Sequence, residues 1–362
     1  MLIHKPYPFL LFFIISFHFS HTALSQVHID SSAIPIFWEI ADTLSADQAP
    51  SVVLWEKFAT HPAYAQIQAS GNRVSFLKKV LPLVFMPSKS EQLKKVLEGK
   101  ESAFQYFAQH LVEVKSKRKD LAKFLSAADF EGYKVAYRKS LNYLPLDIEE
   151  DQVQLNIYLA LFEDNGFGGK VITMDLLHLL RGTSEENLDF FAHEFHHALR
   201  GHTQKHQLYA PTSSTVYPII EALNKIPLEG VASILDKSKY FDQAYYGNSS
   251  AIHPNQMETI EEFQQLVAEA PANLAQIDSI LTSAATPAEK GKQIFQQLPW
   301  SGHVIGFYMS SAIEKKRGRK ILVKAQYSSV RFFAQYQKAA KKDKSLYRFS
   351  KEAIAALKEL NE

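Results

Sequence analysis

The segment from Phe190 to Gly201 reads FFAHEFHHALRG and contains the pattern His-Glu-x-x-His. On a helix, His193 and His197 are four residues apart and lie one turn above each other, so both imidazoles can reach the same point. Two imidazoles in this arrangement suit a tetrahedral zinc ion. Glu194 lies beside them, where a carboxylate can take a proton from a zinc-bound water and pass it to a leaving amine. The pattern therefore predicts a zinc site in which Glu194 is the acid–base group.

The flanking residues predict that this segment is helical. Thr183 and Glu186 have the spacing of a capping box, and Gly201 stands where a helix would end. Apolar residues recur at helical spacing between these signals, namely Leu188, Phe191, Phe195 and Leu199. The two predicted ligands fall outside that apolar stripe. The alternative is a solvated, histidine-rich helix, of which His196, His202 and His206 would be further members.

A zinc site of this kind needs a third protein ligand, and the sequence restricts the choice. A metzincin requires Gly and His at the positions that Arg200 and Thr203 occupy, so this class is excluded. An aspartate-type site has Tyr-Gly close behind the ligand aspartate. Asp242 is followed by Gln-Ala-Tyr-Tyr-Gly, which is one residue too long for this pattern, so Asp242 stays an alternative. Glu229 is the best candidate, because it lies in the otherwise apolar run IPLEGVASIL, where an unpaired carboxylate would be costly.

These residues resemble the gluzincins, zinc peptidases whose third ligand is a glutamate on a second helix downstream of HExxH. More narrowly, the chain resembles secreted bacterial zinc-dependent peptidases in which HExxH is followed by a helix with Glu-Gly-x-Ala. The resemblance rests on His193, Glu194, His197 and Glu229, together with Gly230 and Ala232. It implies Zn²⁺ as the cofactor, a peptide or protein as the substrate and Glu229 as the third ligand.

One position departs from the thermolysin-like pattern. That pattern has an aspartate four residues after the ligand glutamate, and this chain has Ser233 there. Ser233, Asp236 or Asp189 could each supply the group that orients a zinc-bound histidine.

The residues before the HExxH helix predict a small amount of β-structure. Residues 153–162 and 170–177 are expected to be strands, joined by a glycine-rich turn at 164–169 to form a hairpin. In gluzincins an edge strand near the zinc pairs with an extended peptide, and by resemblance Ala160 to Glu163 would be that strand. The alternative is a hairpin that merely covers the helix.

A late apolar segment, residues 300–309, offers two donors for the oxyanion of a tetrahedral intermediate. Zinc peptidases of similar type place a histidine or tyrosine on such a helix, and His303 and Tyr308 are the candidates here. They are five residues apart, about 140° around a helix, so they do not easily face the metal together. The alternative for His303 is a buried histidine that is hydrogen-bonded to the backbone.

The N-terminus has the pattern of a secretory signal peptide. His4 and Lys5 precede an apolar run that extends from Phe9 to Phe19, and small residues follow before Gln26. The chain contains no cysteine, which excludes disulfides, thiolate zinc ligands and a lipid-modified cysteine. The mature protein is therefore expected to be secreted or periplasmic, without stable insertion into a membrane.

The charge pattern does not indicate a nucleic-acid partner. Lysine and arginine number 40 against 38 acidic residues, and no readout motif accompanies the basic runs. The glycines at 166–169 lack the Lys-Ser/Thr of a phosphate-binding loop.

The expected fold is α+β and mostly helical, zincin-like, with a small sheet or hairpin before the HExxH helix. A signal peptide at 1–25 would precede an N-terminal helical region at 26–150, a catalytic core at 151–250 and a C-terminal helical region at 251–362. The expected function is hydrolysis of peptide bonds by a zinc-bound water that Glu194 activates. The alternatives are a hydrolase of non-peptide amides and an exported binding or scaffold protein. A fourth protein ligand, such as His253 or Asp242, would favour the scaffold.

Overall fold

The computed structural model describes residues 27–69, 71, 73–99, 102–128, 132–145, 155–169, 171–202, 214–242, 245 and 254–360. The expected signal peptide, His206 and His253 lie outside these residues. Helices dominate, and a small mixed sheet lies among them, as expected for a mostly helical α+β protein. None of the described helices is long and apolar enough to cross a membrane.

The sheet has four strands in the order β1-β2-β4-β3. Strands β1 (Val27–Asp30), β2 (Leu155–Ala160) and β4 (Ile172–Asp175) run parallel, and β3 (Gly166–Gly168) is the antiparallel edge strand. Strand β2 alternates buried and half-buried residues over most of its length, whereas all four residues of β4 are buried, because helices cover the sheet.

The strands differ from the expectations in three ways. The predicted hairpin does not form, because β2 and β4 are parallel neighbours and the intervening glycine-rich segment supplies β3. Ala160 cannot belong to an edge strand, because β2 pairs with β1 on one side and with β4 on the other. The segment 26–150 was expected to be helical, yet it begins with β1, which pairs with β2 across more than 120 residues of chain.

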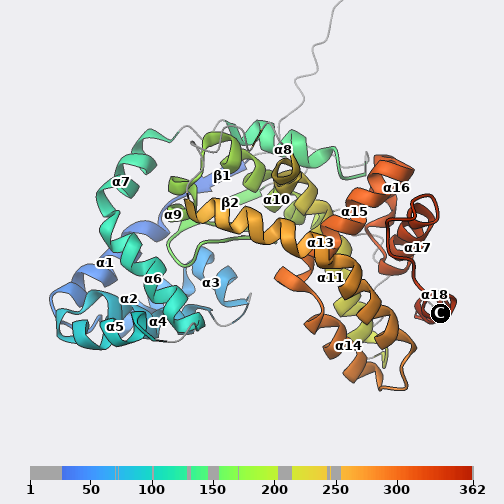
Figure 1. Ribbon diagram of the computed structural model, residues 1–362. Coiled ribbons are helices and arrows are strands. Elements are labelled where there is room, and N and C mark those ends of the chain that lie inside the picture. Colours follow the sequence, from blue (N-terminus) through green and yellow to red (C-terminus); the bar gives the residue numbers. More distant parts are fainter. Residues whose placement is uncertain are drawn as a thin grey trace, which may run out of the picture.

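The N-terminal helices gather at one end of the molecule (Figure 1). They are α1 (Ala33–Ser45), α2 (Val52–Thr60), α3 (Pro62–Ala69), α4 (Arg73–Phe85), η1 (Pro87–Lys89), α5 (Ser90–Leu97), α6 (Ala103–Ser116) and α7 (Arg118–Ala127). The aromatic residues Phe37, Phe58 and Tyr64 are fully buried among them. Since α1 and α3 contact β2, this group of helices is built onto the sheet.

The centre of the molecule holds α8 (Tyr133–Leu141), α9 (Leu176–Arg181), α10 (Ser184–His202) and α11 (Tyr217–Lys237). Helix α10 contacts β3 and β4 on one side and α8 and α11 on the others. Most of the C-terminal helices gather at the opposite end and are drawn in orange to red in Figure 1, and one of them, α13, also crosses the middle of the molecule. They are η5 (Ser238–Phe241), α13 (Pro254–Thr282), α14 (Pro287–Gln296), η7 (Pro299–Gly302), α15 (His303–Arg317), α16 (Arg319–Ala325), α17 (Ser329–Ala340) and α18 (Lys351–Glu359).

Helices α11 and α15 cross at a pair of glycines. A Cβ atom on Gly306 would lie 2.2 Å from the carbonyl oxygen of Ile226 and 2.5 Å from the Cα atom of Gly230. A Cβ atom on Gly230 would lie 2.2 Å from the backbone of Gly306. The two backbones are therefore in direct contact, which only glycine at both positions permits.

This contact predicts how much an added methyl group at the crossing lowers the stability of the fold. We expect Gly306→Ala to lower the free energy of unfolding by about 1–3 kcal/mol or more, because the added atom must push two helix backbones apart. The matched control is Gly201→Ala on α10, where a Cβ atom would meet nothing within 4 Å. That variant should be neutral or more stable by up to about 1 kcal/mol. Urea denaturation measures both, and equal stabilities would contradict the close crossing.

Candidate metal centre

Helix α10 begins at the expected capping box and presents the HExxH residues toward α11. The hydroxyl of Thr183 accepts the backbone N–H of Glu186 at 3.3 Å, and the carboxylate of Glu186 accepts the backbone N–H of Thr183 at 2.8 Å. His193 and Glu194 are buried, and the Nε2 atoms of His193 and His197 are 3.0 Å apart. The helical segment and the approach of the two imidazoles are thus as the spacing predicted.

The edge strand β3 lies directly against the side chain of Glu194. A Cβ atom on Gly168 would lie 2.8 Å from Oε2 of Glu194 and 2.8 Å from Cβ of His197. A Cβ atom on Gly166 would lie 3.2 Å from Oε1 of Glu194 and 2.7 Å from the ring of Phe190. The glycines of this strand therefore let its backbone approach the HExxH helix. From the sequence, they were expected to form a turn.

Glu229 reaches the two histidines from α11. Its Oε2 atom is 3.1 Å from Nε2 of His197 and 4.0 Å from Nε2 of His193. The side chain of Glu229 is 13% exposed, and the neighbouring residue Gly230 is buried. The structure thus brings together the three residues expected to hold the metal.

The geometry of these three side chains fits a zinc ion. Tetrahedral ligands bonded at about 2.0–2.2 Å lie about 3.4 Å from one another. The observed separations of 3.0, 3.1 and 4.0 Å surround this value. Two imidazole nitrogens and a carboxylate oxygen are also the donor types that zinc accepts. Atoms this close are held together either by an imidazole hydrogen or by a cation that all three contact, and the spacing suits the cation.

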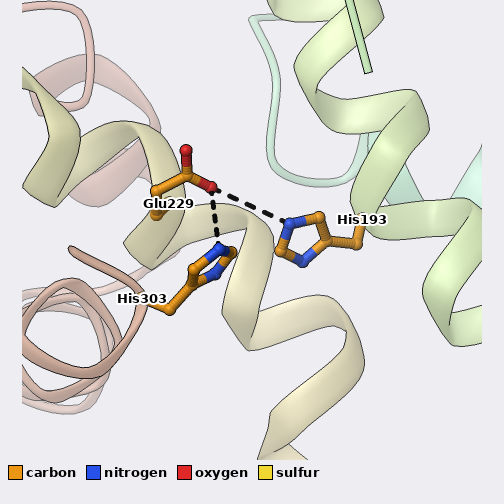
Figure 2. A group of neighbouring side chains, drawn as sticks. All are labelled: His193, Glu229 and His303. Carbon is orange, nitrogen blue, oxygen red and sulfur yellow. Dashed lines mark ion pairs between the residues drawn. The ribbon is translucent and has the colours of Figure 1, made fainter. Parts of the chain in front are cut away.

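His303, the first residue of α15, joins the same group. Its Nε2 atom is 3.4 Å from Oε2 of Glu229, and its ring stacks on that of His193 with centroids 5.2 Å apart. Figure 2 shows His193, Glu229 and His303 converging from three helices. Ligand atoms of these three residues all lie within 4.8 Å of one another. Two overlapping sets of possible ligands therefore share His193 and Glu229, and they differ in whether His197 or His303 completes the set.

The hydroxyl of Ser233 determines which nitrogen of His303 carries the proton. Its Oγ atom is 3.0 Å from Nδ1 of His303, and Ser233 is fully buried. Among the described residues, Nδ1 is the one acceptor that the structure records for this hydroxyl. We infer that this buried hydroxyl donates to Nδ1, which leaves the ring hydrogen on Nε2, facing the site. Burial lowers the pKa of His303 to about 3, which keeps the ring neutral in this tautomer.

Asp236 contacts the other nitrogen of His193. Its Oδ1 atom is 3.1 Å from Nδ1 of His193, although the angle at the ring falls outside that of a hydrogen bond. Burial raises the pKa of Asp236, but the charges of Lys237 and His193 outweigh burial and hold the pKa well below its ordinary value. Of the three candidates, Asp236 is thus the one that contacts His193, while Ser233 contacts His303 instead. Asp189 is paired with Lys239 at 2.9 Å.

The carboxylates of the site have opposite pKa shifts. Burial raises the pKa of Glu194, and the nearby histidines oppose this only in part. Burial also acts on Glu229, but its contacts with the imidazoles of His197 and His303 outweigh burial and hold its pKa well below the ordinary value. A carboxylate that stays ionised suits a metal ligand, and one with a raised pKa suits proton transfer.

The structure does not bring every candidate to this group. Tyr308 packs on Tyr336, with ring centroids 6.1 Å apart, and it does not line the cleft, because it lies on a different face of α15 from His303. Asp242 is exposed after η5 and belongs to no ligand group of the described residues. His196 is fully buried, so the solvated-helix alternative does not describe it.

The histidines lie in a cleft of about 1440 Å³ between the two ends of the molecule. One wall comes from β3, Arg73 and the face of α6 that includes His110. The opposite wall comes from α11, Trp300 and the start of α15. Such a cleft leaves the group of ligands open to a molecule from solvent.

Fold and site together define a helix-rich α+β protein with a metal-binding group of histidine and glutamate in an open cleft. The chain belongs to the family described as "Putative zinc dependent peptidase (DUF5700)", which matches residues 55–345. No curated protein and no solved structure matches the chain. The family description and the His/Glu group agree on zinc as the cofactor, and a peptidase takes a peptide or protein as its substrate.

The ligand geometry predicts the zinc content of variants. We expect about one zinc per chain in the wild type and much less in His193→Ala and Glu229→Ala, because a catalytic site needs three protein ligands. Asp236→Asn should weaken zinc affinity by about 10- to 100-fold through the orientation of His193. Asp242→Ala is the control and should keep its zinc. Elemental analysis measures the content, and a Glu229→Ala protein with wild-type zinc would remove Glu229 from the ligand set.

Proposed function

We propose that this protein is a secreted zinc metallopeptidase of gluzincin type, in which His193, His197 and Glu229 hold the metal. The observation that carries this proposal is the convergence of the two HExxH histidines and Glu229 within 4.0 Å, with Glu194 beside them in an open cleft. The N-terminal signal pattern supports secretion.

Bound zinc would supply a Lewis acid, which polarises a carbonyl and lowers the pKa of water. Glu194 is the proton carrier. It accepts a proton from the water that attacks the carbonyl carbon, and it returns this proton to the nitrogen of the breaking bond. Burial raises its pKa toward the range in which both transfers are favourable. The contact with β3 holds its carboxylate in place, because the backbone at Gly168 leaves the side chain little room.

Strand β3 is the element best placed to hold an extended peptide. It is paired with β4 on one side only, and its residues Gly166, Phe167 and Gly168 line the cleft. A substrate strand that pairs with this edge would pass over Glu194 and the histidines. This assigns to Gly166–Gly168 the role first expected for Ala160 to Glu163.

His303 completes the proposal as a donor to the oxyanion. Because Ser233 donates to its Nδ1 atom, Nε2 carries a hydrogen and points toward Glu229, on the side of the metal. A neutral imidazole with this hydrogen can donate to the negative oxygen that develops on the carbonyl, and it cannot coordinate zinc through Nε2 at the same time.

A second candidate function rests on the distance between His303 and Glu229. The 3.4 Å between His303 Nε2 and Glu229 Oε2 also suits two ligands of one zinc ion. His303 would then be a fourth ligand, and the closed site would be structural, as in a scaffold protein. The hydrogen that Ser233 places on Nε2 favours the first candidate.

Glu194→Gln tests the chemistry of the proposal. Glutamine has the size of glutamate but accepts no proton, so we expect zinc content to stay constant while peptide hydrolysis falls by at least about 10²-fold. Glu221→Gln changes an exposed carboxylate outside the cleft and serves as the matched control. Hydrolysis of a denatured protein substrate, followed by mass spectrometry, measures the rates. Full activity in Glu194→Gln would refute the assigned role.

His303→Ala separates the two candidates. If His303 is a donor, turnover should fall by roughly 10²- to 10³-fold while zinc content stays at the wild-type level, because the interaction exists mainly in the transition state. If His303 is a fourth ligand, zinc content should fall instead. Both quantities are measured on one preparation, together with the melting temperature. Unchanged turnover and unchanged zinc would refute both roles.

A further inference from the structure

One face of α11 carries the functional groups of the site. Polar residues recur along it at intervals of four, four and three, which places them in one stripe on a helix; they are Lys225, Glu229, Ser233 and Asp236. Glu229 contacts His197, Ser233 contacts His303 and Asp236 contacts His193. Three of the four members therefore have a partner in the site, and Lys225 is the remaining one.

Lys225 differs from the other cations of the cleft. Lysine and arginine side chains that line the cleft, apart from Lys225, are each paired with a carboxylate; the pairs are Arg73 with Glu163, Arg181 with Glu113 and Asp164, Lys237 with Asp236, and Lys239 with Asp189. No carboxylate of the described chain lies within ion-pair distance of the Lys225 amine, although the residue is half-buried. Among the described residues, the cleft thus contains one positive charge that no carboxylate neutralises.

The turn before α15 packs over the stem of Lys225. A Cβ atom on Gly302 would lie 3.1 Å from the Lys225 carbonyl oxygen and 3.3 Å from its Cβ atom. Trp300, Ser301 and Gly302 all have positive φ, at 49°, 55° and 106°. Left-handed backbone at two residues that are not glycine costs free energy and persists where surrounding structure imposes it, often at binding sites. Trp300 and Ser301 of this turn line the cleft together with Leu228 and the lysine.

The position of Lys225 on α11 indicates how far its amine lies from the scissile bond of a bound peptide. Side chains one helical turn apart have Cβ atoms about 5–6 Å apart, and Lys225 leans toward the N-terminus of α11, away from Glu229. Its amine then lies roughly 6–10 Å from the ligand group, which an extended peptide covers in about two or three residues at ~3.3 Å each. A substrate group at that distance meets a cation without a partner.

We propose that Lys225 binds a carboxylate of the substrate, about two or three residues from the scissile bond. This proposal rests on the proposed peptidase function and names the substrate class of the same site. The carboxylate belongs either to an aspartate or glutamate side chain or to the C-terminus of the peptide. Both would form the same charge-assisted hydrogen bond with the amine, within a cleft that shields it partly from water.

Two random octapeptide libraries distinguish the sources. Both are acetylated at the N-terminus; one has a free C-terminal carboxylate and the other an amide, and cleavage sites are mapped by mass spectrometry. If the carboxylate comes from a side chain, wild-type protein should select acidic residues at one fixed position in both libraries. If it comes from the C-terminus, cleavage should occur at a fixed distance from the end and only in the free-acid library.

Variants of Lys225 test whether this residue causes the cleavage preference. We expect Lys225→Met to weaken the preference by about 10-fold or more, because methionine cannot donate the charge-assisted hydrogen bond to the carboxylate. Lys225→Arg should retain most of the preference. Lys292→Met removes an exposed lysine of α14 outside the cleft and should cleave as the wild type does. Zinc content and melting temperature are measured for each variant.

The outcomes separate this proposal from the one on which it rests. Identical cleavage profiles in the wild type and Lys225→Met would overturn the role of Lys225 and leave the peptidase function intact. A zinc-loaded wild type that cleaves neither library would overturn the peptidase function, and with it the carboxylate site.

Discussion

The contact between the Gly230 and Gly306 backbones is the constraint on which the site depends. It brings α11 and α15 closer than any side chain would allow. Glu229 precedes one of these glycines directly, and His303 lies one helical turn before the other. The close crossing therefore places a carboxylate and an imidazole from distant parts of the chain within 3.4 Å of each other. The Glu-Gly pair thus combines a ligand with the residue that lets the neighbouring helix approach it.

Helix α11 then distributes the remaining contacts along one face. Asp236 touches His193 on α10, and Ser233 touches His303 on α15. His193 and His303 thus each have one nitrogen facing the ligand group and the other in contact with a polar side chain of α11, an arrangement that is usual around a metal. On the opposite side, β3 packs against Glu194 through glycine. Four elements thus hold the site, and none of them is a long loop.

The sequence predicted local features well and pairing between strands poorly. The capping box at Thr183, the helix through His193 and the approach of His197 follow from spacing within one turn, so they could be read from neighbouring residues. The sheet could not, because the pairing of β1 with β2 joins segments far apart in the chain. The glycines of β3 indicated a turn when read locally, whereas they are required by the backbone approach to α10.

By itself, the sequence determined the chemistry available to this protein: two imidazoles and a carboxylate on one helix, a glutamate in an apolar helix, and a late histidine. These follow because helical periodicity fixes which side chains share a face. The tertiary structure alone decided which groups meet. It placed Asp236 and not Asp189 beside His193, put Tyr308 outside the cleft, and left Lys225 without a carboxylate partner among the described residues. Such choices depend on how close and at what angle helices cross, which is a property of packed surfaces and not of spacing along the chain.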